Sequence, residues 1–129
     1  MTIPSDFRAA AEAEEAVLQE VARHGYSEAS LFALKLALEE GLNNAIRHGN
    51  RFDRNKAVEL SFEVDDRRVV IEISDQGNGF DPAGVPDPTT DENIEKPCGR
   101  GIMLMRAYMD EVRFSRHGCR VRMTKKNIH

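Results

Sequence analysis

The sequence predicts an α+β fold, a two-layer sandwich in which helices cover one face of a mostly antiparallel sheet. Two stretches near the N-terminus repeat apolar residues at the three-and-four spacing of a helical face. Two later stretches alternate apolar and polar residues around a turn, as half-buried β-hairpins do. A third, short helical stretch separates the hairpins, and blocks of helices and antiparallel strands in this order are typical of such sandwiches.

Length and composition indicate one globular domain spanning residues 1–129, since 40% of the 129 residues are hydrophobic and 31% are charged. No apolar run approaches the ~20 residues of a membrane-spanning helix. The N-terminus lacks a basic segment followed by an apolar stretch, so we expect a cytoplasmic protein without membrane attachment. The net charge of −4 disfavours direct nucleic-acid binding. Cys98 and Cys119 have no CxxC spacing, which argues against a thiolate zinc site and a disulfide scaffold.

Each of the two N-terminal helices has a predicted start and end. Ser5 is the predicted N-cap of the first helix, which ends at Gly25. Ser27 is the predicted N-cap of a longer helix that runs to about His48 and ends at Gly49-Asn50. The apolar face of the longer helix consists of Leu31, Leu34, Leu38, Leu42 and Ala45.

The two predicted hairpins follow. Residues 58–64 and 69–73 alternate on either side of a turn at Asp65-Asp66. Val112 and Phe114 lead into a second turn at His117-Gly118, and the alternating residues beyond it are Cys119, Val121 and Met123. After Glu111 the chain carries only basic charges, which is typical of a solvated hairpin face and also suits contact with an acidic partner.

An irregular segment, residues 81–98, lies between the hairpins and contains four of the five prolines of the chain. Segments of this length without regular pattern are usually lids, binding loops or disordered connections. Gly99-Arg100-Gly101 then opens the third helix, predicted from Ile102 to about Met109.

Three segments carry candidate chemistry, and the first lies on the long helix. Glu40, Asn44 and His48 follow one another at steps of four residues, so they rotate by only about 40° per step and share one stripe beside the apolar face. A carboxylate there can accept a proton from a hydroxyl, and an amide oxygen suits Mg²⁺ beside phosphates. The same spacing also describes the solvent-facing stripe of an ordinary amphipathic helix.

The second segment is Asp75-Gln76-Gly77-Asn78-Gly79-Phe80, directly after a predicted strand. Asp75 is in phase with the apolar residues of that strand, so it points toward the apolar side and requires a hydrogen-bond donor. The exocyclic amine of adenine is such a donor, and Gly77 and Gly79 allow the backbone to approach a flat ring. A strand that simply ends in a turn has the same sequence pattern.

The third segment is Gly99-Arg100-Gly101-Ile102. Backbone N–H groups at the start of a helix favour phosphate, and Arg100 adds a positive charge. The spacing is GxGxxL and a proline-rich segment precedes it, so a dinucleotide-binding fold is excluded by context. A plain helix-entry turn remains the alternative.

In this order, the three segments resemble the nucleotide-binding boxes of the GHKL ATPase superfamily, which includes gyrase and the histidine kinases. The matching runs are Glu40-x-x-x-Asn44-Ala45-x-x-His48-Gly49, Asp75-x-Gly77-x-Gly79-Phe80 and Gly99-x-Gly101-Ile102. Within the superfamily, the short chain and the runs Gly101-Ile102-x-Leu104 and Met109-Asp110-Glu111-Val112 most resemble the bacterial anti-sigma-factor serine kinases.

The resemblance implies a histidine-kinase-like α/β sandwich with a mixed, mostly antiparallel sheet and an ATP lid at about residues 81–98. It implies ATP and Mg²⁺ as cofactors, with Asn44 as the metal ligand and Glu40 as the catalytic base toward a serine hydroxyl. Asp75 would bind the adenine amine, and His48 would order the end of the helix. The remaining implied contacts with the nucleotide are Gly77, Gly79, Phe80, Gly99, Arg100, Gly101 and Ile102.

The function implied by the resemblance is an ATP-dependent anti-sigma factor and serine kinase, which binds a sigma factor and phosphorylates an anti-anti-sigma protein, commonly as a homodimer. Two alternatives stay open. One is a non-catalytic switch in which ATP orders the lid to create a partner surface. The other is the stand-alone ATPase half of a split two-component system. A metal hydrolase is disfavoured because the four histidines show no HExxH spacing.

Overall fold

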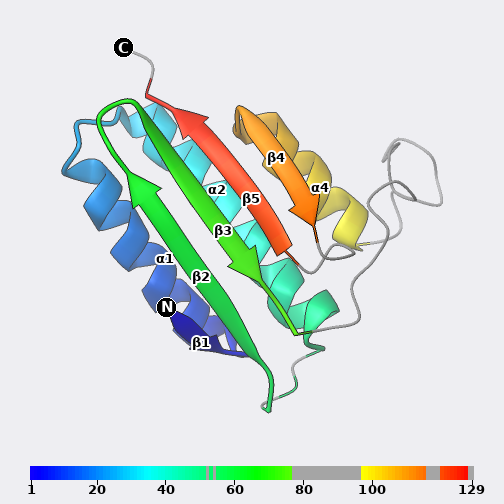
Figure 1. Ribbon diagram of the computed structural model, residues 1–129. Helices are drawn as coiled ribbons and strands as arrows, with labels where there is room; N and C mark the ends of the chain where they lie inside the picture. Colours follow the sequence, from blue (N-terminus) through cyan, green and yellow to red (C-terminus); the bar gives the residue numbers. More distant parts are fainter. Residues whose placement is uncertain (52, 54, 77–96, 116–119, 128–129) are drawn as a thin grey trace.

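The computed structural model describes residues 1–51, 53, 55–76, 97–115 and 120–127 (Figure 1). The strands are β1 (Thr2–Pro4), β2 (Ala57–Val64), β3 (Arg68–Ser74), β4 (Glu111–Ser115) and β5 (Arg120–Lys126). The helices are α1 (Phe7–Ala22), α2 (Glu28–Asn44) and α4 (Pro97–Tyr108), and a π-helical turn, η1 (Ala45–Gly49), continues α2.

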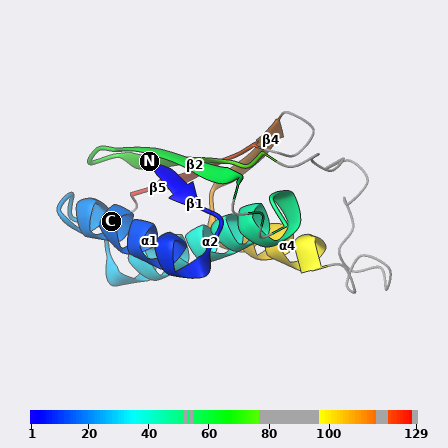
Figure 2. The same ribbon diagram turned by 90° about the horizontal axis from the view of Figure 1, so that it is seen from below.

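The five strands form one sheet in the order β1-β2-β3-β5-β4. The three helices lie on one face of this sheet, with α2 between α1 and α4 (Figure 2). Both predicted hairpins are present, as the antiparallel pairs β2–β3 and β4–β5. The predicted two-layer α+β sandwich is therefore confirmed, although every strand pair in the described part of the chain is antiparallel and no mixed pairing occurs there.

The core lies between the sheet and the helices and follows the two periodicities of the sequence. Strand β3 buries Val69, Ile71 and Ile73, while α2 buries its leucine stripe. Side chains of both layers that are less than 2% exposed include Leu34, Leu38, Leu42, Ile46, Leu60, Ile71, Ile73, Met105 and Met123. Because alternate residues of a strand face opposite sides, the other face of the sheet keeps the polar residues.

The start of α1 differs from the sequence prediction. Asp6, and not Ser5, is the N-cap, since its Oδ1 accepts a hydrogen bond from the Ala9 N–H at 2.9 Å. Ser5 is buried and donates instead to the Lys56 carbonyl oxygen at 2.6 Å. Both residues are good caps by type. The tertiary contact of Ser5 with the chain before β2 decides between them.

The first helix ends as predicted, and so does the start of the second. Gly25 has a φ of 78°, the left-handed conformation that favours glycine after a helix. Ser27 caps α2, accepting a hydrogen bond from the Ser30 N–H at 3.1 Å. The helical path reaches Gly49 as predicted, but its last turn is a π-turn, closed by the Asn50 N–H on the Ala45 carbonyl oxygen at 2.8 Å.

Helix α4 begins earlier than the sequence predicts, at Pro97 instead of Ile102. Proline suits the first turn of a helix, because its fixed φ is helical and the N–H that it lacks has no partner there. Gly99, Arg100 and Gly101 thus belong to the helix and do not precede it, and the last two residues of the segment 81–98 belong to it as well. The rest of that segment and the turn at His117-Gly118 lie outside the described residues.

Strand β1 was not predicted, because three residues are too few to show an alternation. Its register is set by β2, where Ile3 pairs with Val58. Ile3 is 3% exposed and joins the core. The strand places Ser5 and the N-cap of α1 beside the start of β2.

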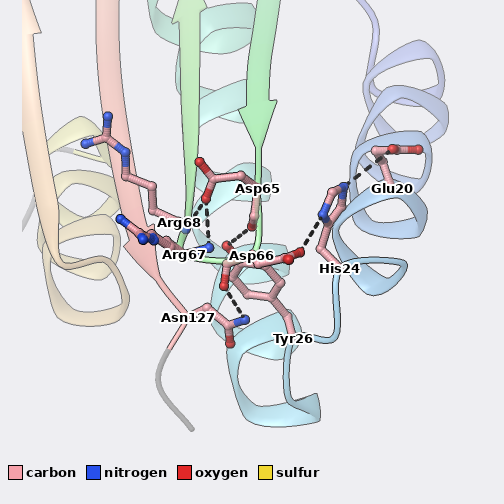
Figure 3. Close-up of polar contacts among 8 residues, drawn as sticks. All are labelled: Glu20, His24, Tyr26, Asp65, Asp66, Arg67, Arg68 and Asn127. Carbon is pink, nitrogen blue, oxygen red and sulfur yellow. Dashed lines mark hydrogen bonds and ion pairs between the residues drawn. The ribbon is translucent and has the colours of Figure 1, made fainter.

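Hydrogen bonds close the end of the sandwich where β2 turns into β3 (Figure 3). The Tyr26 hydroxyl donates to the Asp65 carbonyl oxygen at 2.8 Å, and His24 Nδ1 lies 3.1 Å from Asp66 Oδ1. Asn127 Nδ2 donates to the Asp66 carbonyl oxygen at 2.9 Å. The loop between α1 and α2 and the end of β5 are thereby both attached to this turn.

Among the described helices, none combines the length and the apolar character needed to cross a membrane.

Candidate functional site

Gly41 of α2 lies directly against side chains of the sheet and of α4. A Cβ atom at this position would lie 2.7 Å from Ile73 Cδ1, 3.4 Å from Met123 Cε and 3.7 Å from Met105 Sδ. Glycine therefore leaves room for Ile73, Met123 and Met105 where α2 meets β3, β5 and α4.

The contacts of α2 distinguish the adjacent carboxylates Glu39 and Glu40. Glu39 shares a hydrogen bond with Glu14 of α1 and thus belongs to the interface between α1 and α2. Successive helical residues are about 100° apart, so Glu40 and Asn44 fall on the stripe of Ala33 and Ala37, away from α1. Both alanines are buried. Helix α4 packs against α2 and lies on the other side of it from α1 (Figure 2).

Glu40 and Asn44 are both half-buried, and neither side chain makes a hydrogen bond within the part of the chain that the structure describes. Polar groups at the edge of a packed interface normally have partners. A carboxylate suits the proton of a hydroxyl group, and an amide oxygen suits a divalent cation. The residues present at this stripe therefore fit Mg²⁺ at Asn44.

Over the described ranges, no three His, Cys, Asp or Glu side chains gather into a metal-binding group. Mg²⁺ is commonly held by few protein oxygens and completed by water and phosphate.

Asp75 lies at the same end of the sandwich as Asn44. The bond of Tyr26 with Asp65 joins the beginnings of α2 and β3, and Gly41 touches Ile73 further along both elements. The two elements thus run in the same direction, and their C-terminal ends meet at one edge. Asp75, half-buried, directly follows β3 there.

The N-terminus of α4 reaches this edge too, because α4 runs opposite to α2 (Figure 1). Its C-terminal end leads into β4, whose first residue, Glu111, pairs with Thr124 next to the beginning of β3. Gly99, Arg100, Gly101 and Ile102 lie in the first turns of α4. The first N–H groups of a helix have no partner inside the helix and lie at the positive end of its dipole, which suits phosphate.

The other predicted site residues are less well defined. His48 lies in η1, but its side chain is outside the described part of the structure. Gly77, Gly79 and Phe80 lie outside the described residues altogether. The structure thus brings the helix stripe, Asp75 and the start of α4 to one edge.

One residue at this edge had no predicted role beyond ending a helix. Asn50 is 1% exposed, and its side-chain amide is bonded to three chain segments. No periodicity or spacing distinguishes it from an ordinary helix-ending asparagine, since its partners are distant in sequence.

Comparison with known proteins agrees with this arrangement. Residues 3–125 match the family described as "Histidine kinase-like ATPase domain". The serine-protein kinase RsbW of Bacillus subtilis (strain 168) is 35% identical over 112 residues, which cover 80% of this chain and 69% of that protein. The RsbW proteins of Bacillus licheniformis and Staphylococcus aureus (strain JH9) are 36% and 31% identical, covering 78% and 70% of this chain and 68% and 62% of theirs.

The match extends from β1 to β5, so it includes the sheet, the three helices of the described residues and the edge where Glu40, Asn44 and Asp75 lie. The chain therefore belongs to the family of histidine-kinase-like ATPase domains.

Proposed function

We propose that this chain is an ATP-dependent serine kinase and anti-sigma factor. It binds a sigma factor and transfers the γ-phosphoryl group of ATP to a serine of an anti-anti-sigma protein. The observation that supports this most directly is the stripe of Glu40 and Asn44, which faces away from α1 at the edge shared with Asp75 and the start of α4. The relatives named serine-protein kinases support the same chemistry.

Phosphoryl transfer depends mainly on positioning and on charge stabilisation. In the proposal, Glu40 accepts the proton of the serine hydroxyl while the serine oxygen forms its bond to the γ-phosphorus and ADP leaves. Asn44 holds Mg²⁺, which when bound neutralises the charge of the phosphates. Asp75 accepts a hydrogen bond from the adenine amine and sets the orientation of the nucleotide.

The remaining assignments concern the nucleotide pocket. The first turns of α4, with Arg100, hold the phosphates through backbone N–H groups and one positive charge. Gly77, Gly79 and Phe80 line the adenine side, Ile102 packs at the phosphate end, and His48 orders the helix end. We also propose that residues 1–129 act as one ATPase domain with residues 81–98 as the lid, working as a homodimer in the cytoplasm.

Glu40→Gln tests the role of the base. We expect it to abolish phosphoryl transfer to the partner serine while Mg·ATP still binds with unchanged affinity. Glu39→Gln is the matched control, because it removes the same charge one residue away, on the side that contacts α1. The control is expected to retain transfer. Transfer by Glu40→Gln at the wild-type rate would contradict the proposed base.

Incubation with labelled ATP and candidate sigma and anti-anti-sigma proteins separates the proposed kinase from its alternatives. Phosphoserine on the anti-anti-sigma protein supports the kinase. ATP-dependent complex formation without transfer instead supports the non-catalytic switch, and acid-labile phosphate on a partner supports a split two-component system.

A further inference from the structure

Asn50 is the centre of a buried hydrogen-bond network at the edge of the sandwich. Its Nδ2 group donates to Ser5 Oγ and to the Ala57 carbonyl oxygen, both at 3.0 Å. Its Oδ1 accepts from the Gln76 N–H at 2.7 Å. Both donor hydrogens and the acceptor of the amide are thus in use, and its own N–H closes the π-turn on the Ala45 carbonyl oxygen at 2.8 Å.

Two of these bonds reach the immediate neighbours of candidate site residues. Ala45 follows Asn44, and Gln76 follows Asp75. The bond to Gln76 fixes the peptide group that joins it to Asp75. The bond to Ala45 fixes the turn in which α2 continues beyond Asn44. A single residue therefore connects the end of the helix to the end of the strand.

Further hydrogen bonds connect the partners of Asn50 to one another beside β2 and β3. The Ala57 N–H donates to the Gln76 side-chain oxygen at 2.8 Å, so Gln76 is held by both its backbone and its side chain. Ser5 Oγ accepts from Asn50 and donates to the Lys56 carbonyl oxygen. Removing the side-chain amide of Asn50 takes this partner from the part-buried Gln76 N–H and Ala57 carbonyl oxygen, while the backbone bond to Ala45 remains.

We infer that Asn50 is a positioning residue of the nucleotide site, which holds the backbone at Asp75 in register with the helix that carries Asn44. The inference rests on the proposed function. A π-turn within a helix is frequent at functional sites, and here Asn50 closes it. Asn50 touches no reacting group in this assignment and acts through the two chain segments that it joins.

Asn50→Ala is the principal test. We expect its affinity for Mg·ATP, measured by calorimetric titration, to fall about tenfold or more, since that factor corresponds to the loss of one well-made buried hydrogen bond. The Gln76 amide is expected to lose its protection from hydrogen exchange in the nucleotide-free protein, which is a readout independent of activity.

Two controls separate positioning from general destabilisation. Tyr26→Phe removes a part-buried hydrogen bond (Figure 3), which lies at the opposite end of the sandwich from Asn50. Ser5→Ala removes a partner of Asn50 but leaves its bonds to Gln76 and Ala45 intact. Both are expected to lower the Tm and to bind Mg·ATP as the wild type does.

A second variant is available if Asn50→Ala fails to fold. Asn50→Asp keeps an acceptor oxygen for the Gln76 N–H, so it is expected to retain the protection of that amide despite a lower Tm. Loss of protection in a folded Asn50→Asp protein overturns the inference. Wild-type nucleotide affinity in a folded Asn50→Ala protein does so too, as does an equal loss of affinity in the two controls.

The outcomes distinguish the inference from the proposed function. A wild-type chain that binds no Mg·ATP refutes the proposed function and removes the basis of the inference. A wild-type chain that binds Mg·ATP, together with Asn50→Ala that binds equally well, refutes the inference alone.

Discussion

Glu14 provides a quantitative test of the contact between α1 and α2. Its side chain is buried, and Oε1 has no hydrogen-bond partner among the described residues. Burial, the negative charge of Glu39 and the hydrogen bond with Glu39 together raise the pKa of Glu14 from 4.5 to about 7, against the opposing charge of Lys35. In the folded protein the neutral carboxyl donates its O–H to Glu39.

The difference between the two pKa values of Glu14 sets the size of the effect. An increase from 4.5 to about 7 corresponds to about 3 kcal/mol, at about 1.4 kcal/mol for each pH unit. Below pH 4.5 the carboxyl is protonated in both states, so it costs nothing there. As the pH rises from 4.5 toward 7, the unfolded chain releases the proton while the native state keeps it, so the free energy of unfolding decreases. Above about pH 7 the native state is ionised as well and the loss stays constant.

Glu14→Gln should remove this pH dependence, because its amide can donate to Glu39 without carrying a charge. Urea denaturation followed by circular dichroism should give nearly equal stability for the variant and the wild type at about pH 4, with the variant more stable by up to about 3 kcal/mol at about pH 8.5. Glu15→Gln is the control, because it removes a charge from the adjacent, exposed position. Parallel stability curves for wild type and Glu14→Gln from pH 5 to pH 8.5 would refute the raised pKa of the Glu14 carboxyl.

Three further substitutions test local packing and capping. Gly41→Ala brings a methyl group within 2.7 Å of Ile73 Cδ1, so overpacking should exceed the gain in helix propensity and lower the free energy of unfolding by about 1 kcal/mol. A variant as stable as the wild type in thermal unfolding would show that Ile73 moves aside freely. Asp6→Ala and Ser27→Ala each remove an N-cap and should cost about 1 kcal/mol. The costs should add in the double variant, measured by urea denaturation, since the caps belong to different helices; a clearly non-additive result would indicate that the two helix starts are coupled.

Local patterns determined most of the architecture. Both hairpins, the capping role of Ser27 and the leucine stripe of α2 are visible in the sequence because each depends on near neighbours in the chain. The side-chain periods of helices and strands report the buried face directly. The candidate residues Glu40, Asn44 and Asp75 could likewise be named from their spacing and from the resemblance.

The starts and ends of elements depended on contacts that local patterns do not contain. Ser5 and Asp6 are equally good caps by type, and the bond of Ser5 with Lys56, far along the chain, decides between them. Strand β1 is too short to show a period and exists because β2 supplies its hydrogen bonds.

The candidate site likewise combines features that local sequence patterns determine with features that only tertiary contacts determine. Its residue types and spacing are properties of the sequence alone. Three further features are properties of the tertiary structure, because each joins segments that are distant in the sequence. They are the contact of Glu39 with α1, the close packing at Gly41 and the hydrogen bonds of Asn50. A pattern within one element sets which face is buried, and only packing between elements sets which polar groups lose their water and which partners they then find.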